Sequence, residues 1–171
     1  MAVLRGVRDV GRGARLTDRS GLGLRPGLIL LTLLGLVAAC ERPDPRLRPE
    51  QLLRDSLGLG DDDRVHRVRL VSEGNRESPD PASLVIRPGD YVQFVSGDQR
   101  VHVVSFPPGG LAPPAAEFLR TTGQLSSPPL LVADARFVVT FADAPPGLYP
   151  FLVVGNGTQA PGTIEVGEAK R

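Results

Sequence analysis

The chain has 171 residues, with 20 Lys and Arg, 19 Asp and Glu, and a formal net charge of +1 at pH 7. This length suits one domain with extensions, and a charge so near zero gives no strong attraction to nucleic acid. Twenty glycines and 17 prolines are typical of a turn-rich β protein.

Residues 1–39 have the organisation of a secretion signal. Arginines recur through residues 1–26, and an apolar run follows at 27–39. The run of about 13 residues is shorter than the roughly 20 that a transmembrane helix needs. It ends in Val-Ala-Ala-Cys, which resembles a bacterial lipobox, so we expect cleavage before Cys40 and lipidation of its sulfur. An uncleaved signal anchor and a redox or catalytic thiol at Cys40 are the alternatives.

Residues 40–63 are interpreted as a tether. Its prolines keep the first part extended, and residues 49–58 have Pro at the first helical position and Gly just past the end. These signals predict a short helix with Leu52, Leu53 and Leu57 on one stripe. Because a helix this short is marginal alone, we expect it to dock on the domain or on a partner.

The domain is expected at residues 64–167, followed by a polar tail at 168–171. Alternation predicts a first strand at 65–71, and residues 72–81 are interpreted as a polar loop. The clearest strand patterns lie in 85–106 and 137–166. Each contains a Pro-Gly turn signal.

Residues 107–136 form a long connection between these two segments. Its prolines favour a short helix near 113–119, and a loop of this length is usually either functional or disordered. The family resemblance described in the next paragraph implies that this connection wraps the side of a β-sandwich, with four apolar residues packed there: Leu111, Phe118, Leu125 and Leu130.

The order of short motifs resembles the cupredoxin family. The motifs are P-G-D-x-V-x-F (88–94), H-x-V-x-F (102–106), F-x-x-x-F (137–141), P-G-x-Y-x-F (146–151) and G-x-I-x-V (162–166). The resemblance covers roughly 100 residues and implies an all-β, Greek-key β-sandwich of about seven or eight strands. It also implies a copper site whose ligands are His, Cys, His and usually Met.

The copper ligands are mostly missing. His102 matches the first ligand, but Val153 stands at the Cys position, Asn156 at the second His position and Ala160 near the Met position. A type-1 copper site needs a thiolate, and the only Cys in the chain is Cys40. The sequence therefore predicts a cupredoxin scaffold with a vestigial site and no blue copper.

His102 has two interpretations. It is either a neutral core-edge imidazole bonded to a backbone carbonyl or to Asn156, or a ligand of a weak copper site completed by His66, Asp98 or a partner chain. We hypothesise that the Asn156 amide faces His102 while Val153 fills the place of the sulfur. On this hypothesis, Val153→Cys, Asn156→His and Ala160→Met together restore blue copper.

The expected function is non-enzymatic, since no catalytic constellation is recognisable. We expect an extracytoplasmic module without a cofactor, anchored to the bilayer through Cys40, that binds an envelope protein. Its docking patch would contain Pro107, Pro108, Leu111, Leu152 and Pro161. The alternatives are a copper-binding electron carrier of the plastocyanin or azurin type, and a non-blue copper carrier that uses His66 and His102.

Overall fold

The computed structural model describes residues 44–168. The expected signal segment and Cys40 lie outside these residues. Within them, no helix combines the length and the apolar character needed to cross a membrane. The strands are β1 (Val65–Glu73), β2 (Arg76–Asp80), β3 (Ser83–Ile86), β4 (Tyr91–Ser96), β5 (His102–Ser105), β6 (Arg136–Thr140), β7 (Gly147–Gly155) and β8 (Ala160–Val166). The helices are η2 (Pro45–Leu47), α2 (Gln51–Leu57), η3 (Pro108–Gly110) and α3 (Pro113–Thr121).

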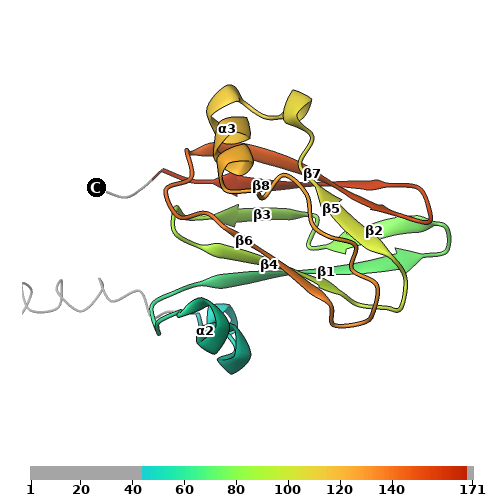
Figure 1. Cartoon of the computed structure of the whole chain (residues 1–171), viewed down its shortest axis with the longest axis horizontal. Coiled ribbons are helices and arrows are strands. Elements are labelled where there is room, and N and C mark those ends of the chain that lie inside the picture. The colour runs from blue at the N-terminus through green and yellow to red at the C-terminus, as the bar shows by residue number, and fades with distance from the viewer. Residues whose placement is uncertain (1–43, 169–171) are drawn as a thin grey trace, which may run out of the picture. The chain divides into compact units, whose positions relative to one another are not determined.

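The eight strands form two four-stranded sheets that face each other (Figure 1). Sheet A has the order β2-β1-β4-β6, and sheet B has the order β3-β8-β7-β5. One pair in each sheet is parallel, β1 with β4 and β3 with β8, while the other pairs are antiparallel. This arrangement confirms the predicted all-β Greek-key sandwich.

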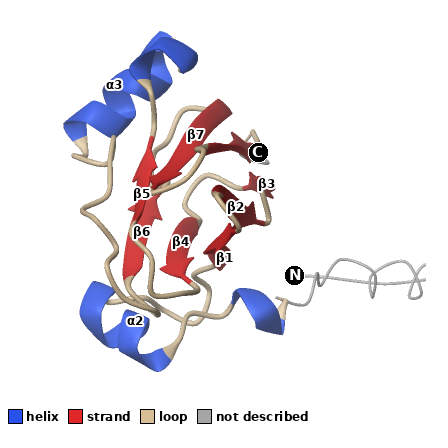
Figure 2. Cartoon of the chain, turned by 90° about the vertical axis from the view of Figure 1, so that its right-hand side faces the viewer, coloured by secondary structure: helices blue, strands red, loops and turns tan. Residues whose placement is uncertain are grey.

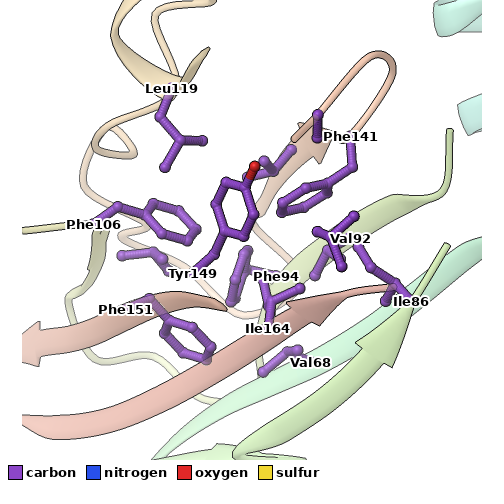
Figure 3. Close-up of a cluster of buried hydrophobic side chains, with 14 of the residues drawn as sticks. Val68, Ile86, Val92, Phe94, Phe106, Leu119, Phe141, Tyr149, Phe151 and Ile164 are labelled. Carbon is purple, nitrogen blue, oxygen red and sulfur yellow. The ribbon is translucent and has the colours of Figure 1, made fainter. Parts of the chain in front are cut away.

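Aromatic rings fill the space between the sheets (Figure 3). Phe94 of β4 meets Phe151 of β7 edge-on, with ring centroids 5.1 Å apart. Phe141 meets Tyr149 in the same way at 5.3 Å. Edge-to-face contacts of this kind add to the free energy gained by burying the rings. The motifs that the sequence singled out therefore supply the inward faces of the central strands.

The Pro-Gly signals form the expected turns. Gly89 has φ 93°, a conformation that is costly for other residues. The carboxylate of Asp90 then accepts a hydrogen bond from the Arg87 N–H at 3.1 Å, which holds the turn closed. Gly147, with φ 146°, similarly starts β7. These turns fix the register of β4 and of β7.

The long connection wraps the sandwich as predicted. Leu130 is buried in the main core, and Leu111, Phe118 and Leu125 pack against it. Beyond Phe118, the connection runs along β5, where Leu130 and His102 exchange backbone hydrogen bonds of 2.8 and 3.1 Å. It therefore covers the side of β5 that has no strand neighbour in sheet B.

Helix α2 packs on the outer face of sheet A, on the opposite side of the sheets from α3 (Figure 2). Leu53 and Leu59 contact Val65, Tyr91 and Val138 there. The predicted leucine stripe is wrong in part, because Leu52 and Leu57 are 74% and 48% exposed. The reason is that Gly58, with φ 67°, turns the chain and brings Leu59 to the sheet in place of Leu57.

Candidate functional site

His102, the residue that matches a copper ligand, is completely buried at the start of β5. Both of its ring nitrogens meet a carboxylate. Nδ1 lies 2.7 Å from Glu77 Oε2, and Nε2 lies 2.9 Å from Asp98 Oδ1. Only an imidazolium donates a hydrogen bond at both nitrogens. The geometry therefore supports a charged ring held between two acids.

Glu77 reaches His102 from the other sheet. It lies on β2, where alternation turns Glu77 and Pro79 inward, and it is only 2% exposed. The Ser72 hydroxyl lies 3.2 Å from each Glu77 carboxylate oxygen. A buried carboxylate needs such partners, because its desolvation is otherwise costly.

Gly155 of β7 makes room for Glu77. A Cβ at this position would collide with the Glu77 carboxylate and would lie 2.6 Å from the carbonyl oxygen of Val101. Gly155 also pairs in register with His102. The absence of a side chain at Gly155 is therefore what allows an acid from sheet A to reach the histidine of sheet B.

Asp98 closes the other side of the ring. Its oxygens accept 2.8 Å hydrogen bonds from the backbone N–H groups of Ser72 and Arg100. Burial alone would raise the pKa of Asp98, but these bonds, the hydrogen bond with His102 and the charge of His102 outweigh it and hold the pKa below its ordinary value. Asp98 is thus kept ionised beside the ring.

Three turns converge on this network. The Thr158 N–H, in the turn after β7, donates to the Asn75 carbonyl of the β1–β2 turn at 2.7 Å. The guanidinium of Arg100, in the loop before β5, donates to the Gly74 carbonyl at 2.8 Å. We call Glu77, Asp98 and His102 the ionic cluster. Its position joins β2, β5 and the loop between β4 and β5.

The second histidine belongs to a separate pair. His66 Nε2 lies 2.7 Å from Asp90 Oδ2, and both residues are buried. Burial would raise the pKa of Asp90, but the hydrogen bonds from His66 and from the Arg87 N–H, with the charges of His66 and Arg64, outweigh it and hold the pKa below its ordinary value. This pair lies at the opposite end of β1 from Ser72.

The interpretation of His66 and His102 as joint copper ligands is therefore wrong. Ser72, which bonds Glu77, lies six residues beyond His66 on an extended strand, a span of roughly 20 Å. Two ligands of one ion cannot be that far apart. Among residues 44–168, no group of three His, Cys, Asp or Glu side chains is placed to hold a metal ion.

The other three predicted copper positions divide between the core and the surface. Val153 and Ala160 are buried and are cross-strand partners, and Val153 also pairs with Val104 of β5. Asn156 is exposed in the turn after β7. The expected contact between Asn156 and His102 is wrong, since the register places Gly155 opposite His102 and the carboxylates occupy both ring nitrogens.

Glu77 is the functional residue that sequence reasoning missed. The loop predicted at 72–81 is in fact the end of β1, a two-residue turn and β2. The sequence of β2, Arg-Glu-Ser-Pro-Asp, has no apolar alternation to indicate a strand. Gly155 was the available signal, because a glycine within a strand often marks a close approach.

The residues present do not fit type-1 copper. The site offers one imidazole, two carboxylates and the apolar side chain of Val153, and residues 44–168 contain no thiol. Blue copper requires two imidazoles and a thiolate. The fold is a sandwich of two four-stranded sheets, and the donor set around His102 is not that of a blue-copper protein.

Comparison with solved structures gives matches to cupredoxins. A mutant fern plastocyanin is 21% identical, with 58% of this chain and 98% of that chain covered and a TM-score of 0.43. A purple cupredoxin from Nitrosopumilus maritimus is 18% identical, with 59% of this chain and 98% of that chain covered and a TM-score of 0.37. Pseudoazurin from Methylobacterium extorquens AM1 is 20% identical, with 62% of this chain and 77% of that chain covered and a TM-score of 0.36. The sequence matches no protein-family model and no curated protein.

Proposed function

We propose that this protein is a non-enzymatic, cupredoxin-like binding module in which the ionic cluster takes the structural place of a copper site. The observation that carries the proposal is that each ring nitrogen of His102 bonds a carboxylate oxygen, at 2.7 and 2.9 Å. A copper ion that took either nitrogen would have to displace Glu77 or Asp98. The plastocyanin-type electron carrier is therefore the weaker alternative.

The cluster has a clear structural role in this proposal. Glu77 belongs to sheet A and His102 to sheet B, so their contact joins the two sheets where three turns meet. Charge-assisted hydrogen bonds are stronger than neutral ones, and the buried acid gains additional bonds from Ser72. The site is thus held together by the protein's own side chains.

The outer face of sheet B supplies a docking surface for a protein partner. Val85, Leu148 and Val154 are 69%, 57% and 38% exposed. Leu152 and Pro161, two of the residues predicted for a docking patch, are cross-strand partners on β7 and β8. Exposed apolar surface of this kind is typical of interfaces. Pro107, Pro108 and Leu111 lie instead in the connection before α3, where Leu111 packs partly against the core.

Anchoring at the outer surface of a bacterial inner membrane, or inside the outer membrane, completes the proposal. Its support is the basic stretch, the apolar run and the Val-Ala-Ala-Cys sequence at 37–40. A soluble sandwich with an apolar docking face would then work as an accessory or scaffold subunit of an envelope complex. Mass spectrometry of the protein extracted from membranes should show the mass of attached lipid in the wild type and none in a Cys40→Ser variant, and a wild-type chain without lipid would contradict lipidation.

A copper titration tests the metal-free part of the proposal. The full chain is titrated with Cu(II) and followed by visible and EPR spectroscopy, with a His102→Asn variant in parallel. We expect no intense thiolate-to-copper band and no difference between the two proteins. One equivalent of tightly bound Cu(II) that is lost in His102→Asn would overturn the proposal.

The docking face is tested by charge insertion. Leu148→Lys places a charge on the outer face of sheet B, and Leu52→Lys, at the most exposed leucine of α2, is the matched control. Proteins that co-purify from native membranes should be retained by the control and lost by Leu148→Lys. If both variants recover the same co-purifying proteins, the outer face of sheet B is not the docking surface.

A further inference from the structure

A second polar site lies where the tether meets the outer face of sheet A. It is a cavity of about 110 Å³. Its walls come from η2, α2, β1 and β4, and it is lined by Arg46, Arg48, Glu50, Leu53, Val65, Arg67 and Gln93. The tether and the sandwich both contribute, so the cavity exists only when the tether is docked.

Gln93 gives this cavity an unused hydrogen-bond donor. The side chain is 1% exposed, and Nε2 has no hydrogen-bond partner among the described residues. The Gln93 Oε1 accepts a long hydrogen bond of 3.4 Å from Arg67 Nε, a contact that favours this orientation of the amide. Buried donors without an acceptor are rare in folded proteins. An acceptor atom in the cavity would therefore satisfy Gln93.

The charges around the cavity favour an anion. Glu50, the one acid in the lining, is already paired with Arg67 and with Arg136, the latter at 2.7 Å. Within residues 44–168, the guanidinium groups of Arg46 and Arg48 form no ion pair. Two cations and one amide donor thus share a small space.

We propose that this cavity binds a phosphate-type oxyanion, with Gln93 Nε2 and the guanidinium groups of Arg46 and Arg48 as donors. A cavity of about 110 Å³ has room for one tetrahedral oxyanion. Arginine is well suited to this role because its planar donors match phosphate oxygens.

The oxyanion has two sources, free phosphate and the headgroup of an anionic phospholipid. Arg46 lies six residues after Cys40, and an extended chain of that length spans at most about 20 Å. If Cys40 carries lipid, as proposed above, a headgroup is within reach of the cavity. Only the binding of a lipid headgroup rests on the proposed function, since binding of free phosphate does not require the anchor.

The side-chain amide of Gln93 reports directly on binding. The full chain, ¹⁵N-labelled and in a non-ionic detergent, is titrated with inorganic phosphate, and chloride at equal ionic strength is the control. We expect a saturable shift of the Gln93 Nε2 resonances with phosphate only. An equal response to chloride would overturn the proposal. So would the absence of a response both to inorganic phosphate and to the phosphatidylglycerol vesicles described below.

Variants assign the donors. Arg46→Ala with Arg48→Ala should weaken phosphate binding by about tenfold or more. Both side chains are exposed, so we expect the double variant to fold as the wild type does. Arg120→Ala, at a 64% exposed arginine of α3 on the opposite side of the sheets, should bind as the wild type. Equal binding by the double variant would overturn the assignment.

Vesicles distinguish the two sources. Cys40→Ser protein is mixed with phosphatidylcholine vesicles that contain or lack phosphatidylglycerol, and the Gln93 resonances are recorded. A response to phosphatidylglycerol that the double arginine variant lacks identifies the headgroup as a ligand. A response to phosphate alone assigns the site to the free anion and leaves the anchoring proposal to its own test.

Discussion

Glu77 and His102 are 25 residues apart in the sequence, yet Glu77 Oε2 and His102 Nδ1 lie 2.7 Å apart and connect the two sheets. Both side chains are almost completely buried. Removing one partner of a buried pair leaves the other charge without compensation, which costs far more than the net value of the pair. This contact is therefore the most sensitive point of the candidate site.

Glu77→Ala should lower the free energy of unfolding by about 3–5 kcal/mol, the usual cost of breaking a buried ion pair. Urea unfolding followed by circular dichroism measures the change. Glu73→Ala, at an exposed acid of the same hairpin, should stay within about 0.5 kcal/mol of the wild type. Equal stability of the two variants would show that Glu77 is not paired with His102.

Gly155→Ala should also destabilise the protein, because its Cβ would collide with the Glu77 carboxylate. We expect a loss of about 1–3 kcal/mol, typical of overpacking. Gly109→Ala is the matched control, since a Cβ there meets nothing within 4 Å. Adding Glu77→Ala to Gly155→Ala removes the clash with the carboxylate and leaves only the close contact with the Val101 carbonyl oxygen, so the two effects should be less than additive in thermal or urea unfolding.

The sequence predicted the strands whose inward-facing side chains are apolar. Val92, Phe94, Val104 and Phe106 show period-two alternation, and all are core residues. It did not predict β2, because the inward positions of that strand are Glu77 and Pro79. An inward glutamate is stable only when a distant histidine and serine meet it, and no local pattern carries that information.

The candidate site was predictable at His102 and not at its partners. The family motif singled out His102, and its assignment of Val153 and Ala160 as vestigial copper positions stays a prediction. It misplaced Asn156, since the turn after β7 begins one residue beyond the pairing with His102 and leaves Asn156 exposed. Which groups surround His102 depends on tertiary contacts, and one of them is an acid from the other sheet.

Restoring copper should need more than the missing ligands. We now expect the variant with Val153→Cys, Asn156→His and Ala160→Met to remain colourless with Cu(II), because Glu77 and Asp98 hold both nitrogens of His102. Adding Glu77→Ser frees Nδ1 of His102, but the exposed side chain at position 156 still supplies no second imidazole, so the intense visible thiolate band should remain absent. Blue colour in the triple variant alone would show that the cluster yields easily to copper.

The tether should detach when its buried leucine is shortened. Leu53 is 7% exposed and packs against sheet A, whereas its neighbour Leu52 is 74% exposed. Leu53→Ala should speed hydrogen exchange of the α2 amides and expose the tether to proteolysis, since this short helix depends on docking. Leu52→Ala should leave both rates unchanged. If both variants behave alike, α2 is not held by Leu53.

Acid should destabilise the protein through Asp90 and Asp98. The pKa of each carboxyl is held below its ordinary value of 3.8 in the folded state. A lowered folded pKa adds stability that is fully present above the ordinary pKa and is lost as the pH falls through the folded one. The free energy of unfolding should therefore fall as the pH drops below about 4.

Asp90→Asn isolates the contribution of the pair with His66. This variant should be less stable than the wild type at neutral pH, and its stability should depend less on pH below about 4, because one group with a lowered pKa is gone. Asp62→Asn, at an exposed acid before β1, should retain the wild-type pH profile. A profile for Asp90→Asn that parallels the wild type would mean that Asp90 gains nothing from His66, Arg64 and the Arg87 N–H in the folded state.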